Sequence, residues 1–178
     1  MTHFKPVFLQ LLFITFIVLS IASCDKRTSK DTSDPNDTLF FGKAAVINLE
    51  EIELGKLAEQ KSKMTDIKNL GKMMQEDHSK LMESLTALAK EKSIMLPSLD
   101  KAEWDDYQTL NTISGMGFDK KYCDMMANGH KGAIAIFEKD SADTKDADVR
   151  QWVIAAIPVL RKHLSYSMMC RKKYDRLN

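Results

Sequence analysis

Three histidines in this 178-residue chain lie at apolar positions of helix-forming segments, where a polar side chain needs a partner. Each of His78, His130 and His163 lies three or four residues from apolar side chains of its own segment. Glu51 is spaced in the same way from apolar residues of an earlier segment. A buried polar group without a partner costs roughly 2–7 kcal/mol. Because helical bundles build metal sites from carboxylates and imidazoles on facing helices, Glu51, His78, His130 and His163 form a candidate metal site or buried polar cluster.

Hydrogen bonding offers these side chains a second explanation. They can bond to one another, to buried water, or to Asp77, Tyr122 or Tyr166, and so fix the register of the helices without a metal. The sequence leaves both explanations open, and a transition-metal ion is the only cofactor that the residues suggest.

The residue pattern of diiron proteins is absent. Those bundles carry a Glu three residues before a His on two helices, whereas Gln75 precedes His78 and Leu160 precedes His163 at that spacing. Motifs for nucleophilic catalysis, glycine-rich phosphate loops and CxxC pairs are missing as well. No catalytic residue is therefore assigned, and the sequence leans against an enzyme.

The heights of these residues along their helices predict which of them meet. Counting about 1.5 Å per residue from the polar turn at 141–146 offsets His130 and His163 by roughly 9 Å, so these two are not expected to touch. Glu51 and His78 are nearly level when counted from the turn near 63–64. We therefore expect Glu51 and His78 to be buried and joined by a hydrogen bond.

Methionine is frequent, with eleven residues. Met74 with His78 and Met126 with His130 repeat a four-residue spacing that puts a thioether and an imidazole on one helix face. Such soft ligands suit Cu(I). Methionine in a helical seam is more often a core residue that fills gaps, so this pattern alone does not assign a copper site.

The N-terminus has the features of an export signal. Residues 6–22 carry no charge and follow Lys5, and Ile21-Ala22-Ser23-Cys24 resembles the lipobox of bacterial lipoproteins. We expect residues 1–23 to be a signal peptide, Cys24 to be lipidated, and polar residues 24–38 to form a flexible tether. The expected location is the bacterial cell envelope, with the membrane as partner through the lipid. Balanced charge argues against nucleic-acid binding.

Two further cysteines lie in the remaining chain. Cys123 and Cys170 stand seven residues from His130 and His163, on the same helix faces, and an exported protein meets an oxidising compartment. They are therefore a disulfide candidate, although the height count requires a kink at Pro158 or a shifted turn to bring them together.

Residues 39–178 read as an all-α domain. Good helix formers dominate, and apolar residues recur every three or four positions rather than alternating. The pattern predicts four long helices, at about 39–62, from Thr65 as cap to about 94, 118–140 and 147–173, with a short helix capped by Ser98 over 98–114. Together these elements predict a four-helix bundle with a short extra helix in the crossover between the second and third long helices.

The domain resembles a family of bacterial exported ferritin-like proteins of unknown function, often labelled predicted outer-membrane proteins. The resemblance spans about 39–169, and its matching segments are 51–58, Met74 with 77–80, 96–97, 114–115, 118–122, 126–130, 137–138 and 157–164. It implies a ferritin-like fold and supplies no activity. The favoured hypothesis is a lipid-anchored envelope module with a non-catalytic structural or binding role, including stress tolerance; the alternative is a metal-binding or redox protein that uses the buried Glu and His residues.

Overall fold

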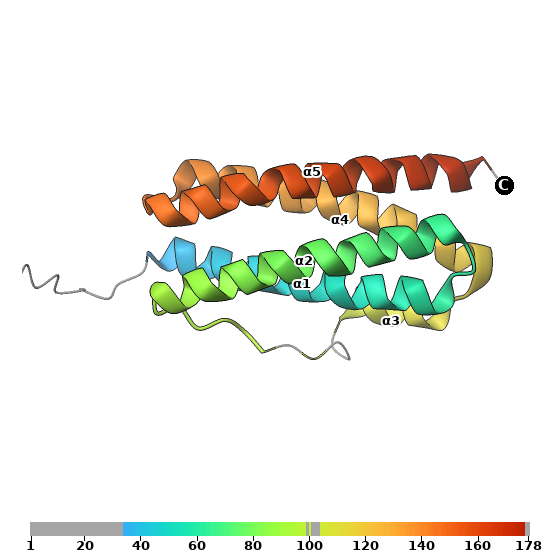
Figure 1. Cartoon of the computed structure of the whole chain (residues 1–178), viewed down its shortest axis with the longest axis horizontal. Helices are drawn as coiled ribbons and strands as arrows, with labels where there is room; N and C mark the ends of the chain where they lie inside the picture. Colours follow the sequence, from blue (N-terminus) through green and yellow to red (C-terminus); the bar gives the residue numbers. More distant parts are fainter. Residues whose placement is uncertain (1–33, 99, 101–103, 177–178) are drawn as a thin grey trace, which may run out of the picture. The chain divides into compact units, whose positions relative to one another are not determined.

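The computed structural model describes residues 34–98, 100 and 104–176, all within one compact unit, Asp31–Asn178. The elements are α1 (Pro35–Lys61), α2 (Thr65–Glu91), α3 (Asp105–Thr112), α4 (Gly115–Asp143) and α5 (Ala147–Asp175). The described part contains no strand (Figure 1). The predicted all-α bundle with a short helix in its crossover is confirmed. None of the described helices combines the length and apolar character needed to cross a bilayer.

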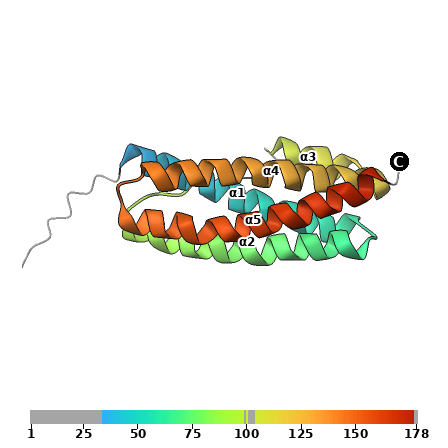
Figure 2. The ribbon, with the colours of Figure 1, turned by 90° about the horizontal axis from the view of Figure 1, so that it is seen from above.

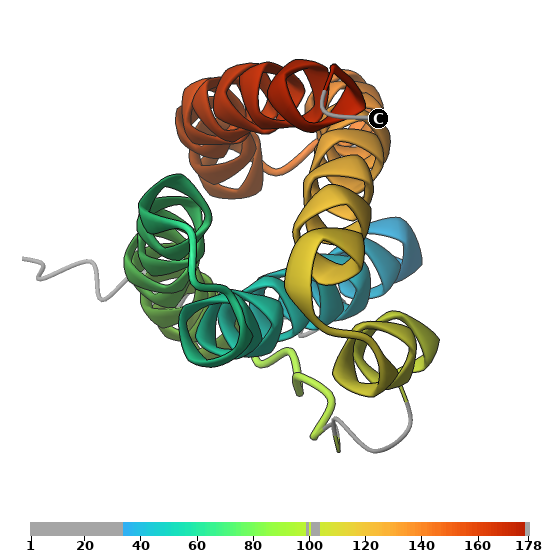
Figure 3. The same cartoon turned by 90° about the vertical axis from the view of Figure 1, so that its right-hand side faces the viewer.

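Two antiparallel hairpins make the bundle. One hairpin is α1 with α2 and the other is α4 with α5, and they pack with α2 against α5 and α1 against α4. Helix α2 ends at one end of the bundle and α4 begins at the other, so neighbouring long helices run antiparallel (Figures 1 and 2). Seen along the bundle, α3 lies outside the four long helices, against α1 and α4 (Figure 3).

Several helix ends differ from the sequence prediction. Helix α1 begins at Pro35, so residues 35–38, predicted to belong to the tether, are helical; Pro is well suited to a first helical turn, and Asp34 caps the helix by accepting from Asn36 N at 2.9 Å. The cap predicted at Thr65 is wrong, because Met64 holds the cap position without a side-chain bond. The cap predicted at Ser98 is also wrong, since α3 begins at Asp105.

The described apolar core consists of two clusters. One extends from Phe40 to Leu160 and includes the aromatic pair Phe40 and Phe137, whose ring centroids lie 5.1 Å apart. The other extends from Leu54 to Tyr174 and includes stacked Phe118 and Tyr122. A layer of polar side chains lies between the two clusters along the bundle, and the candidate site occupies this layer.

Each hairpin is held together internally, the first by a close backbone crossing and the second by a disulfide. A Cβ atom built on Gly55 would lie 2.5 Å from the Gly71 carbonyl oxygen, and one on Gly71 would lie 2.6 Å from the Gly55 oxygen, so α1 and α2 touch through their backbones. Helices α4 and α5 are joined by the disulfide Cys123–Cys170, with Cα atoms 5.6 Å apart. Both contacts belong to the half of the bundle that contains the second cluster.

Replacing Gly55 with Ala should destabilise the protein. The added methyl group would clash with the backbone of Gly71, and overpacking of this kind costs about 1–3 kcal/mol. Urea denaturation measures the loss. Gly132→Ala is the matched control, because nothing lies within 4 Å of the added atom in α4, and Ala there should raise the stability by up to about 1 kcal/mol. Equal effects of the two changes would contradict the close crossing.

Candidate metal centre

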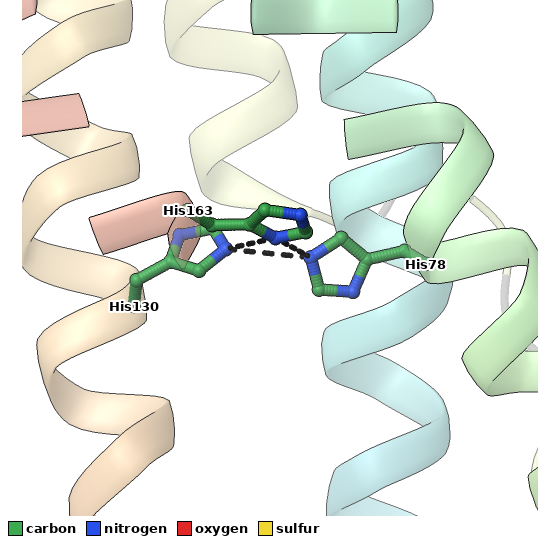
Figure 4. A group of neighbouring side chains, drawn as sticks. All are labelled: His78, His130 and His163. Carbon is green, nitrogen blue, oxygen red and sulfur yellow. Dashed lines mark hydrogen bonds between the residues drawn. The ribbon is translucent and has the colours of Figure 1, made fainter. Parts of the chain in front are cut away.

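Three imidazole rings meet in the polar layer between the apolar clusters. His78 comes from α2, His130 from α4 and His163 from α5, and Figure 4 shows the rings pointing toward one another. Their exposed fractions are 0%, 1% and 0%. The fourth long helix, α1, contributes Asn48, which is 1% exposed. Each long helix thus places one polar side chain at this level of the core.

The facing nitrogens form a nearly equilateral triangle. His78 Nε2 lies 3.3 Å from His130 Nε2, His130 Nε2 lies 3.2 Å from His163 Nδ1, and His163 Nδ1 lies 3.2 Å from His78 Nε2. Three nitrogens bound at about 2.0 Å to one ion with tetrahedral angles lie about 3.3 Å from one another. The triangle therefore has the dimensions of one face of a tetrahedral metal site.

The outer nitrogen of each ring faces an oxygen acceptor. His130 Nδ1 donates to the Met126 carbonyl oxygen at 2.8 Å, and His163 Nε2 donates to Asp77 Oδ2 at 3.0 Å. His78 Nδ1 lies 3.0 Å from Asn48 Oδ1, whose amide is oriented by donation from Nδ2 to the Ala44 carbonyl oxygen at 2.7 Å. All three acceptors require a proton on the outer ring nitrogen.

This pattern fixes the protonation of the inner nitrogens. A neutral imidazole carries one proton, and here the outer nitrogen holds it, so each inner nitrogen presents a lone pair. Three lone pairs then face one another with no donor between them. A cation at the centre gives all three a partner, whereas an added proton gives a donor to one ring and a water molecule could donate to two.

Burial opposes the imidazolium form. It lowers the pKa of His130 and of His163 to about 4. Burial, together with the neighbouring His130 and His163, holds the pKa of His78 well below its usual value. At Asp77, burial raises the pKa, but the hydrogen bonds from Lys162 and His163 prevail and lower it to about 2. At neutral pH the site therefore consists of three neutral imidazoles, with an ionised carboxylate on the outer side of His163.

Glu51 is buried but lies outside the triangle. Its exposed fraction is 7%, its Oε1 atom lies 3.6 Å from His130 Nδ1, and its Oε2 atom has no hydrogen-bond partner among the described residues. Burial, followed by the charge of Asp106, raises its pKa to about 8. The predicted hydrogen bond between Glu51 and His78 is wrong, because Asn48 occupies the position beside His78.

The expectation that His130 and His163 do not meet is also wrong. Helix α4 continues to Asp143 and α5 begins at Ala147, which reduces the height difference of the two histidines to about 4.5 Å. Helical side chains also lean toward the N-terminus of their helix. Because α4 and α5 run in opposite directions, His130 and His163 lean toward each other and close the remaining distance.

The structure joins the predicted cysteine pair and brings some of the expected hydrogen-bond partners to the histidines. Cys123 and Cys170 share the helices and the height difference of the two histidines, and they are bonded. Asp77, among the expected hydrogen-bond partners, contacts His163. The Tyr122 hydroxyl group is buried and has no hydrogen-bond partner within the described segments, and Tyr166 is 52% exposed. Asn48 was not predicted, although its spacing of four residues from Ala44 and three from Glu51 is a seam signal.

Comparisons with known proteins place the chain among helical bundles. The family described as "Domain of unknown function (DUF4142)" matches residues 22–168, and no curated protein matches. A crystal structure of a DUF305 fragment from Deinococcus radiodurans is similar with a TM-score of 0.69 at 12% identity, covering 78% of this chain and 97% of the fragment.

CopM is a second structural neighbour. Its Cu(I)-bound and Cu(II)-bound forms give TM-scores of 0.65 and 0.63 at 13% identity. The matches cover 78% of this chain and 96% and 97% of the respective CopM chains. At these identities the likeness concerns the fold alone.

The stability of the metal-free protein should fall as the pH is lowered from about 6.5 to about 4. The pKa of His130 and His163 is about 4 in the folded protein, against an ordinary value of 6.5, so protons bind preferentially to the unfolded chain in this window. Each such histidine contributes a slope of up to about 1.4 kcal/mol per pH unit. Urea denaturation between pH 4.5 and about 7 in the presence of a chelator measures the slope.

The control for this slope is His130→Gln, which should show a shallower dependence than the wild type. Glu51 acts in the opposite direction, because a pKa raised to about 8 gives stability that is present below about pH 4.5 and lost as the pH rises toward 8. Because Glu51 lies beside His130, the same measurement on His163→Gln, which leaves that contact in place, separates the histidine slope from the contribution of the carboxyl group. Parallel curves would contradict a neutral, buried His130.

Proposed function

We propose that this chain, which belongs to the family described as a domain of unknown function (DUF4142), binds one transition-metal ion through His78, His130 and His163. The observation that carries the proposal is the convergence of three unprotonated ring nitrogens at 3.2–3.3 Å. Among the described residues, these three form the group of metal-ligating side chains whose donor atoms lie close enough to hold one ion. Imidazole nitrogen suits zinc, copper, iron and nickel.

A purely structural role accounts less well for this arrangement. A packing layer of hydrogen-bonded histidines needs a donor for every acceptor, yet each proton of the neutral rings is already used on the outer side. Leaving polar acceptors unpaired in an apolar core costs free energy. A bound cation removes that cost, because all three lone pairs then become ligands.

The outer partners support the same function. Histidine ligands in metal sites usually donate their second ring proton to a carboxylate, a carbonyl or water, which fixes the tautomer and the ring orientation. Here Asn48, the Met126 carbonyl group and Asp77 fill these roles. In this proposal the three histidines serve as ligands of the ion, and the function that we assign to them is binding.

Adding Zn²⁺ or Cu(I) should stabilise the wild-type protein. An ion at 100 times its dissociation constant adds about 2.7 kcal/mol to the free energy of unfolding, which corresponds to a rise in Tm of roughly 5–10 °C. The shift should be absent in His130→Gln and His163→Gln. Differential scanning calorimetry, with metal content measured on tag-free protein, provides the test.

The control for this experiment is Glu138→Gln, which alters an exposed side chain paired with Arg161. It should keep the full metal-dependent shift. Circular dichroism establishes that the histidine variants retain the helical fold. A shift of equal size in the wild type and the histidine variants would place the ion elsewhere, and the absence of any shift would refute metal binding.

A second proposal concerns where the protein works. The uncharged segment 6–22 followed by Ile21-Ala22-Ser23-Cys24 supports a lipoprotein signal peptide, with a lipid on Cys24 that anchors the bundle in the bacterial cell envelope. These residues lie outside the described part of the chain. A ferritin-like relationship is also proposed, supported by two antiparallel helix pairs joined by one long crossover.

Replacing Cys24 with Ser should release the protein from the membrane fraction or leave it unprocessed, because serine cannot receive the thioether-linked lipid. Fractionation of cells followed by mass spectrometry of the protein measures both effects. Cys123→Ser serves as a control for the loss of a cysteine as such. Unchanged membrane partitioning together with a normal mature mass would refute the anchor.

A further inference from the structure

We infer that the ion held by the three histidines is cuprous, Cu(I), and that the thioethers of Met74 and Met126 make the site selective for it. This inference rests on the proposed metal binding and adds the identity of the ion. Three observations carry it: the number of ligands, the charge around the site, and the residues that flank the triangle.

The site offers too few hard or borderline ligands for a typical divalent ion. In the part of the chain that the structure describes, no fourth His, Cys or carboxylate joins the group formed by His78, His130 and His163. The carboxylates of Glu51 and Asp77 lie on the outer sides of the His130 and His163 rings. Protein-bound Zn²⁺ is almost always four-coordinate and would need a fourth ligand beyond these three side chains. Cu(I), a d¹⁰ monocation, is stable with three ligands.

The charge near the triangle also favours a monocation. All three ligands are neutral, and the Asp77 carboxylate is shared with Lys162, whose Nζ lies 2.9 Å from Oδ2, and with Lys80 at 3.7 Å from Oδ1. Little negative charge therefore remains to balance an ion. The cost of burying an ion grows with the square of its charge, so a monocation costs about a quarter as much as a dication of equal size.

Two fully buried methionines flank the triangle on one side. Met74 and Met126 are 0% and 1% exposed, and each lies one helical turn N-terminal to a ligand, four residues before His78 and His130 respectively. Helical side chains lean back over the preceding turn, so both imidazoles extend over the turn that carries the methionine. Helices α2 and α4 run in the same direction (Figure 1), which puts both thioethers on the same side of the three nitrogens.

Helix α5 adds no competing hard ligand on that side, and the Glu51 carboxyl group of α1 lies beside Nδ1 of His130, the outer ring nitrogen. On α5 the equivalent residue is Ser167, four residues after His163 and 0% exposed, and its hydroxyl group donates to the His163 carbonyl oxygen at 2.8 Å. An ion displaced from the plane of the nitrogens toward this side moves toward the helical turns that carry Met74 and Met126. Thioether sulfur is a soft ligand that favours Cu(I) over Zn²⁺.

The test compares Cu(I) and Zn²⁺ affinities in the full chain, purified in detergent, by competition with chromogenic chelators, anaerobically for Cu(I). The variants are Met74→Leu with Met126→Leu, which preserves the packing volume, and His163→Gln. The control pair is Met168→Leu with Met169→Leu, 48% and 67% exposed in the wild type. We expect one Cu(I) per chain and a loss of Cu(I) affinity of at least about tenfold in the Met74/Met126 variant. Zn²⁺ affinity and the control variant should be unchanged.

Other outcomes separate the two proposals. Zn²⁺ binding that depends on His163 without Cu(I) binding would overturn the cuprous assignment and leave metal binding intact. An unchanged Cu(I) affinity in the Met74/Met126 variant, or an equal loss for both ions, would overturn the role of the thioethers. Failure of both ions to bind would overturn the proposed function itself. X-ray absorption of the copper-loaded protein adds an independent readout, since sulfur scattering should disappear in the Met74/Met126 variant.

Discussion

The convergence of three ring lone pairs in a buried layer between two apolar clusters is the constraint around which this bundle is organised. An unpaired acceptor inside a protein is unfavourable, and here three of them, on His78, His130 and His163, point at one spot. The outer hydrogen bonds prevent the rings from turning their protons inward, and burial prevents them from taking up extra protons. Apolar clusters lie on either side of the layer, so the unpaired lone pairs lower the stability of an arrangement that suits a cation.

The helices keep these nitrogens in place through contacts one heptad away. Gly55 and Gly71 lie seven residues from Asn48 and His78, and Cys123 and Cys170 lie seven residues from His130 and His163. Seven residues are about two helical turns, so each contact falls on the same helix face as its polar residue. The Gly55–Gly71 backbone contact of one hairpin and the covalent link of the other therefore share a single level, roughly 10 Å from the histidines.

Much of the fold follows from the sequence, because spacing of apolar residues and a scarcity of Gly and Pro specify long helices directly. The same spacing puts His78, His130 and His163 in the core. Which of them meet depends on the helix ends and on the lean of side chains in antiparallel neighbours, and a shift of three residues at one turn decides between contact and separation. Asn48 and Glu51 show a detail that the spacing of apolar residues does not predict. Both face inward on α1, and the exact placement of that helix makes Asn48 the partner of His78.

Because the bundle is divided into two hairpins, an ion bound at the site would link one hairpin to the other. Each hairpin is secured internally, one by the crossing of Gly55 and Gly71 and the other by a disulfide, while the first hairpin supplies one ligand and the second supplies two. An ion bound by all three would act as a crosslink between His78 and His163, residues 85 positions apart. Such a link restricts the unfolded chain as a disulfide does. The separation of the first hairpin from the second is then the motion that depends on whether the ion is bound.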